Sequence, residues 1–126
     1  MIATETVKRL TALCNKPVAL GGWLGLPYEE NGCLKFAIKF YKEIGIDTDE
    51  TAMHEARNFI DVAEAQFGDL AVFNGVGVWH VGVMLDRRWM IQCSQSEVTN
   101  GVGKVRIDDY PFGERFRGFK RHILCS

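Results

Sequence analysis

Two short runs decide the fold of this chain: Gly68-Asp69-Leu70-Ala71-Val72-Phe73 and His80-Val81-Gly82-Val83-Met84-Leu85. Both are rich in β-branched and aromatic residues and are bounded by Gly, Asn or Asp, which is typical of short strands. The same texture recurs further on, so we predict strands over Leu70–Phe73, Val78–Leu85, Trp89–Ile91, Val102–Ile107 and Phe116–Ile123. Successive strands with short connections indicate a meandering antiparallel sheet of about five strands.

The residues before Gly68 have helical spacing instead. Asn31 is a good N-cap, Gly45 is a good stop, and the apolar positions between them recur at helical intervals: Leu34, Ala37, Ile38, Tyr41 and Ile44. Shorter helices are predicted over Thr4–Leu13 and Asp49–Asn58, and the stretch 59–67 fits either helix or irregular chain. Helices followed by a sheet predict an α+β domain with the helices packed on the sheet.

Length and charge narrow the class of protein. A chain of 126 residues predicts one domain over 1–126, and 15 basic against 16 acidic side chains give no reason to expect a nucleic-acid partner. The N-terminus lacks the apolar run of a signal peptide, and no stretch has membrane-spanning length. We therefore expect no membrane association and a protein that is cytoplasmic as synthesised, or that leaves the cytoplasm by assembly into a larger particle.

Four cysteines, Cys14, Cys33, Cys93 and Cys125, are expected to be free thiols, because reducing compartments rarely keep disulfides. They form no Cys-x-x-Cys pair and have no accompanying His pair, so we expect no metal and no other cofactor.

Cys33 is the candidate nucleophile. It lies at the start of the predicted helix, where unpaired backbone amides and the helix dipole favour an anion, so the pKa of its thiol is expected to fall below about 8.5. A cysteine at a helix start is also a common packing residue, and its role therefore depends on a base within reach.

His80 is the candidate base, because it begins the clearest strand, whereas His54 and His122 are expected to be solvated or structural. Gln92 ends the next strand and is the candidate for orienting the imidazole. In a hairpin turning near Arg87, Gln92 falls opposite residues 81–82, so a small register shift or bulge is expected to bring it to His80.

These residues occur in an order that resembles the NlpC-type cell-wall peptidases, which have a papain-like fold. The resemblance covers nearly the whole chain and includes the two opening runs together with Leu26-Pro27-Tyr28, Gly32-Cys33, Phe40-Tyr41-Lys42-Glu43-Ile44-Gly45-Ile46, Met90-Ile91-Gln92-Cys93-Ser94 and Arg117-Gly118-Phe119-Lys120-Arg121. It implies that Cys33 is the catalytic thiolate, His80 the general base and Gln92 the third residue of the site. Tyr28 matches a tyrosine beside the site, and Asp69 matches an aspartate with a structural role.

The resemblance also implies a substrate and a reaction. A peptidoglycan stem peptide would be cleaved at the amide bond between D-glutamate and the diamino acid, without a cofactor. The chain has Gly32-Cys33-Leu34-Lys35 where family members usually have Asp-Cys-Ser-Gly, so the thiol chemistry is better supported than this substrate.

Two other functions fit the same residues. Phage-tail versions of the fold are similarly short and lack a signal peptide, so the chain could instead be an inactive structural component of a virion tail that binds other tail proteins. A thiol acyltransferase or deamidase is the second alternative, in which Trp23, Trp79 and Tyr28 would line an apolar groove for the substrate.

Overall fold

The computed structural model describes residues 32–54, 57–74, 79–95, 100–110 and 113–125. Its elements, in chain order, are α2 (Gly32–Glu43), α3 (Glu50–His54), β1 (Phe59–Val62), β2 (Leu70–Asn74), β3 (Trp79–Met84), β4 (Trp89–Gln95), β5 (Asn100–Arg106), η2 (Ile107–Asp109), η3 (Gly113–Arg115), β6 (Phe116–His122) and η4 (Ile123–Cys125). The helix predicted over Thr4–Leu13 lies outside the described residues.

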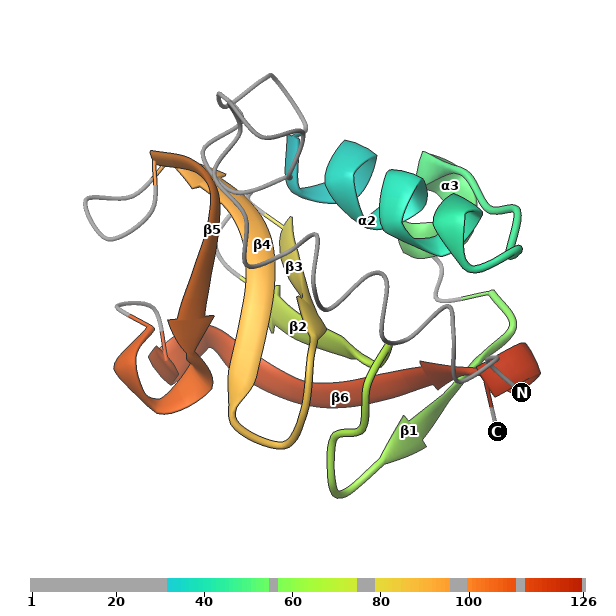
Figure 1. The fold of residues 1–126 in the computed structure, drawn as a ribbon. Helices are drawn as coiled ribbons and strands as arrows, with labels where there is room; N and C mark the ends of the chain where they lie inside the picture. Colours follow the sequence, from blue (N-terminus) through green and yellow to red (C-terminus); the bar gives the residue numbers. More distant parts are fainter. Residues whose placement is uncertain (1–31, 55–56, 75–78, 96–99, 111–112, 126) are drawn as a thin grey trace.

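The six strands form one antiparallel sheet in the order β1-β6-β2-β3-β4-β5. The consecutive strands β2 to β5 form the predicted meander. β6 departs from it, because it returns between β1 and β2 instead of continuing at the β5 edge (Figure 1). The α+β class of the sequence analysis is confirmed, with one strand more than expected.

The additional strand is β1, in the stretch 59–67 that the sequence left between helix and irregular chain. Phe59 and Val62 are half-buried, whereas Ile60 and Asp61 are exposed. The segment therefore lacks the alternation of buried and exposed residues that is typical of a half-buried strand. β1 forms because β6 offers it a partner, with Phe59 paired to His122. A contact between residues this far apart in the chain cannot be read from local spacing.

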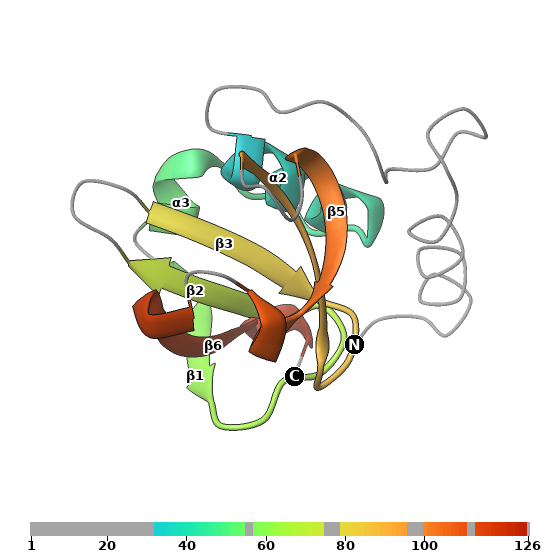
Figure 2. The same cartoon turned by 90° about the vertical axis from the view of Figure 1, so that its left-hand side faces the viewer.

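α2 covers one face of the sheet, and α3 packs beside it (Figures 1 and 2). The apolar side of α2 and the even-numbered residues of β2 form the main core, which includes Leu34, Phe40, Tyr41, Leu70 and Val72. The odd-numbered residues of β2 point to the other face, where η2 and η3 lie, and join a second core made of Ala65, Ala71, Phe73, Met84, Met90, Val105 and Tyr110. Both faces of the central strands are therefore buried.

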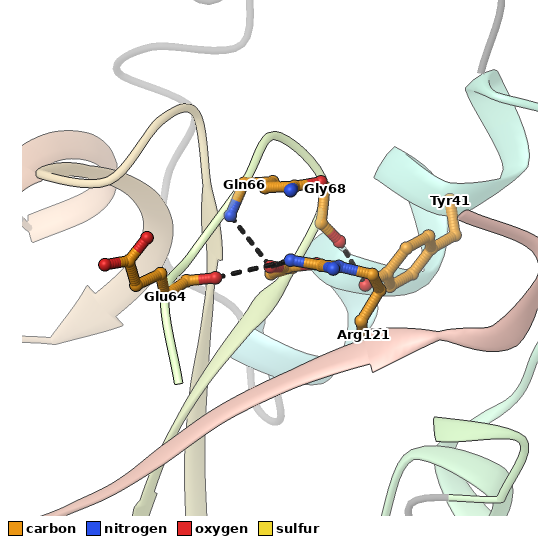
Figure 3. A network of polar contacts seen from close by, with 6 residues as sticks. Tyr41, Glu64, Gln66, Gly68 and Arg121 are labelled. Atoms are coloured by element: carbon orange, nitrogen blue, oxygen red, sulfur yellow. Dashed lines mark hydrogen bonds and ion pairs between the residues drawn. The ribbon is translucent and has the colours of Figure 1, made fainter. Parts of the chain in front are cut away.

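A buried ion pair connects the start of β2 to β6. Asp69 is fully buried and accepts two hydrogen bonds from Arg121, from Nε at 2.9 Å and from Nη2 at 2.8 Å, and one from the backbone amide of Gln66. Figure 3 shows Arg121 also reaching the carbonyl of Glu64. This agrees with the structural role that the resemblance implied for Asp69.

The turn that carries Asp69 depends on Gly68. Its φ of +89° lies in the left-handed region, which glycine adopts without steric cost. The Gly68 carbonyl accepts a hydrogen bond of 2.6 Å from the hydroxyl of Tyr41 (Figure 3), and the Gly68 amide donates to the carbonyl of Met84. α2, the turn and β3 are thereby held together.

Candidate active site

Cys33 is the second residue of α2, as the sequence predicted, and its half-buried side chain packs against the main core. Its thiol interacts with the backbone amides of Leu34, of Cys33 itself and of Val81 in β3. The interaction with Val81 is the informative one, because Val81 directly follows His80. The helix start and the base-bearing strand therefore meet at this point of the fold.

His80 and Gln92 form a direct hydrogen bond: Nε2 of His80 lies 2.6 Å from Oε1 of Gln92. An amide oxygen can only accept, so Nε2 carries the proton and donates it. Nδ1 is then the imidazole nitrogen with a lone pair, the atom that can take a proton from a thiol. Gln92 is fully buried, so water does not compete for this hydrogen bond and the tautomer is maintained.

The pairing of β3 with β4 explains how Gln92 reaches His80. Val83 pairs with Ile91 and Met84 with Met90, so the same register places Gln92 across from Gly82 and makes His80 its diagonal neighbour on one face. Diagonal neighbours lie within reach of long side chains. The recorded pairs between β3 and β4 end at Val83 and Ile91, so the register shift or bulge that the sequence analysis expected near Gln92 stays a prediction.

Gly82 leaves room for this arrangement. A Cβ built at Gly82 would overlap with Sδ and Cγ of Met90 and lie 3.3 Å from Cβ of Gln92. Met90 is fully buried in the second core and has little room to retreat. Only glycine at this position lets Met90 and Gln92 occupy the space between the two strands.

Burial shifts both members of the proposed pair toward their neutral forms. It raises the pKa of the Cys33 thiol above its ordinary value of 9.0, against the smaller opposing effect of the three backbone amides. It lowers the pKa of His80 to about 4, although the hydrogen bond that His80 donates to Gln92 acts in the other direction. The sequence predicted a lowered thiol pKa from the helix dipole; that prediction was wrong because desolvation is the larger effect.

Sequence reasoning missed two aromatic residues around His80. The His80 ring is parallel to that of Tyr110, with an interplanar angle of 7° and centroids 5.5 Å apart, and it is tilted by 48° against Phe73 at 5.7 Å. Phe73 is the β2 residue paired with His80, so strand register could have identified it. Tyr110 lies 30 positions after His80 and follows η2, where no spacing signal exists.

The other candidate residues do not belong to the group of Cys33, His80 and Gln92, or they lie outside the described residues. Tyr28 and Trp23 lie outside them, and of Trp79 only the backbone position in β3 is described. His122 is buried and its Nδ1 accepts a hydrogen bond from the amide of Leu124, which is the structural role expected of it.

Among the described residues, Cys33, Cys93 and Cys125 form no disulfide. In the same part of the chain, no three His, Cys, Asp or Glu side chains gather in a way that could hold a metal ion. Nor does this part contain a helix with the length and apolar character needed to cross a membrane.

Comparison with known proteins decides the family. The model of the NlpC/P60 family matches residues 20–120, which include Cys33, His80 and Gln92. This chain belongs to the NlpC/P60 family. Members of this family are generally cysteine peptidases or amidases.

Two solved structures of NlpC/P60 proteins are similar to the chain. The first, a lipoprotein-like NLP/P60 family protein from Staphylococcus aureus subsp. aureus Mu50, has a TM-score of 0.73 and 21% identity over 96% of this chain. The second, an NlpC/P60 family protein from Bacillus cereus ATCC 10987, has a TM-score of 0.67 and 26% identity over 80% of it. The chain spans 42% and 37% of their lengths, respectively. A comparison with curated proteins gives no match.

Proposed function

We propose that this NlpC/P60 chain hydrolyses an amide bond in a peptidoglycan stem peptide, with Cys33 as nucleophile, His80 as base and Gln92 as the residue that orients His80. The observation that carries the proposal is the 2.6 Å hydrogen bond from His80 Nε2 to Gln92 Oε1, next to the Val81 amide that interacts with the Cys33 thiol. The three proposed residues lie on α2, β3 and β4, far apart in the chain.

The reaction starts from a neutral thiol and a neutral imidazole, in keeping with the directions of their pKa shifts. Nδ1 of His80 takes the thiol proton as the sulfur attacks the carbonyl carbon. The carbonyl oxygen becomes an oxyanion, and the Cys33 backbone amide at the start of α2 is the proposed donor to it.

The imidazolium formed in this step then protonates the leaving amine, which breaks the C–N bond and leaves a thioester on Cys33. Water attacks the thioester while Nδ1 accepts one of its protons, and the released thiol recovers that proton. The proposed bond is that between D-glutamate and the diamino acid, by analogy with the family. The substrate and its contacts with Tyr28, Trp23 and Trp79 are parts of the proposal.

Incubation with a synthetic stem peptide, followed by mass spectrometry of the products, tests the proposal. Cys33→Ala should abolish cleavage, His80→Ala should lower kcat by about 10²–10⁴-fold, and Gln92→Ala should cause a smaller loss, because the imidazole stays but is no longer held. Cys125→Ser, which removes a different partly buried thiol, is the matched control and should keep wild-type activity. Transfer of the acyl group to an added amine in place of water would instead identify an acyltransferase.

Thiol labelling separates an active site from an inert one without any assumption about the substrate. Iodoacetamide should alkylate Cys33 near neutral pH faster than Cys125, and this preference should disappear in His80→Ala, because the base then no longer removes the thiol proton. Equal labelling rates in the wild-type protein would exclude the hydrolase and favour a structural component of a phage tail.

A further inference from the structure

We propose that Tyr110 is a positioning residue for the base of this site: its ring, stacked on the His80 imidazole, holds the plane in which Nδ1 must accept the proton. The inference rests on the proposed function of His80 and adds a residue to it from a different part of the chain. Tyr110 does not touch the reacting atoms in this proposal and acts only through His80.

The contacts of the His80 ring define its plane from two directions. Gln92 holds Nε2 by a hydrogen bond at the edge of the ring. Tyr110 covers a face of the ring, since the two planes differ by only 7° with centroids 5.5 Å apart, which is an offset-stacked geometry. A hydrogen bond at one nitrogen still allows the ring to tilt about that contact, whereas stacking opposes tilting.

Tyr110 is itself held in place. It is buried and packs against Phe73 at 4.8 Å between ring centroids, so the rings of His80, Phe73 and Tyr110 are in mutual contact. Its amide donates to the carbonyl of Ile107, and the Ile107 amide donates to the carbonyl of Arg88 in the turn between β3 and β4. The backbone before Tyr110 is thus fastened to the hairpin that carries both His80 and Gln92.

Few groups that can carry a charge lie around the imidazole, so its surroundings are almost apolar. Phe73 from β2, Gln92 from β4 and Tyr110 contact the ring, and of these only the phenol of Tyr110 can ionise. The Cys33 thiol interacts with the amide of Val81, the residue after His80 in β3. The carboxylates of η2 are exposed. This environment accounts for the lowered pKa of His80, and the Tyr110 ring contributes to it by keeping water off one face.

Replacement of the ring separates positioning from a role of the hydroxyl. Tyr110→Phe keeps the stacked ring and should keep kcat within about threefold of wild type, with the His80 pKa unchanged. Tyr110→Leu removes the aromatic face, so kcat should fall at least about tenfold with little change in KM. In an NMR titration of the imidazole, the His80 pKa should rise from about 4 toward its ordinary value in Tyr110→Leu.

Phe119→Leu is the matched control, because Phe119 packs against the same second core through Phe116 and is not among the rings in contact with His80. It should lower stability without moving the His80 pKa. The proposal is overturned if Tyr110→Leu leaves both kcat and the His80 pKa at wild-type values, or if Tyr110→Phe loses as much activity as Tyr110→Leu.

Two measurements do not depend on the Leu variant or on catalysis. In the wild-type protein, the His80 ring protons should show upfield ring-current shifts and nuclear Overhauser effects to the Tyr110 ring, and their absence would also overturn the proposal. The NMR titration that compares Tyr110→Leu with the wild-type protein also needs no catalysis, so it reports on stacking even if the wild-type chain cleaves no stem peptide. Failure of the proposed function is therefore distinguishable from failure of this inference.

Discussion

Asp69 and Arg121, 52 positions apart in the chain, are joined by two hydrogen bonds of 2.9 and 2.8 Å between the start of β2 and the end of β6. The Asp69 side chain has no exposed surface, and that of Arg121 has 15%. A second ion pair, between Lys120 and Asp61, connects β6 to β1, but its Asp61 side chain is 85% exposed. The two pairs differ in burial, and this difference leads to the first prediction.

Asp69→Asn should lower the free energy of unfolding by about 3 kcal/mol, because it leaves a largely buried guanidinium without its counter-charge. Asp61→Asn is the control and should cost less than about 1 kcal/mol, because an exposed ion pair contributes little. Urea denaturation of both variants measures these values. Equal losses would contradict the structural role assigned to the buried pair.

Gly82→Ala should disturb the candidate site through packing. The added methyl group would overlap with Met90, which is buried, and press on Gln92, so we expect a loss of about 1–3 kcal/mol in stability and reduced activity. Gly113→Ala adds the same group where nothing lies within 4 Å and should be close to neutral. Thermal unfolding and stem-peptide cleavage of the two variants provide the comparison.

Stability should fall with acidification through the pH range set by His80. Its pKa is about 4 in the folded chain and about 6.5 when unfolded, so between these values the unfolded state binds more protons and stability rises with pH. The total loss should be about 3 kcal/mol, most of it between pH 6.5 and pH 4, and it should level off about one pH unit below the folded pKa.

The His80→Asn variant isolates this contribution, because every other titratable group of the chain remains in it. The difference between the two unfolding curves, measured in urea at a series of pH values, should shrink as the pH is lowered from 6.5 to 4. A difference that does not vary with pH would mean that the His80 pKa is not shifted by folding.

Gln92→Glu should change the pH dependence of the site. A carboxylate beside Nε2 favours the imidazolium, so the His80 pKa should rise by roughly 1–3 pH units and the acid limb of kcat/KM should move upward with it. Gln66→Glu, at an exposed glutamine, is the control and should leave the profile unchanged. A wild-type profile for Gln92→Glu would argue against a role of residue 92 in setting the state of the base.

The sequence by itself was sufficient for the elements whose signals are local. The apolar spacing from Leu34 to Ile44 and the stop at Gly45 predicted α2 almost to its bounds, and the alternation of β-rich runs with Gly and Asp predicted β2 to β6. The position of Cys33 at a helix start and of His80 and Gln92 on adjacent strands followed from the same signals, because hydrogen bonding and side-chain spacing within an element depend on near neighbours.

Features that depend on contacts between residues far apart in the chain could be seen only in the folded structure. β1 exists because β6 pairs with it, Tyr110 reaches His80 through the path of η2, and Asp69 meets Arg121 across the sheet. The states of Cys33 and His80 belong to this group as well. Their pKa values depend on how much water the packed chain excludes, and desolvation is a property of the assembled core that the helix dipole at Cys33 does not outweigh.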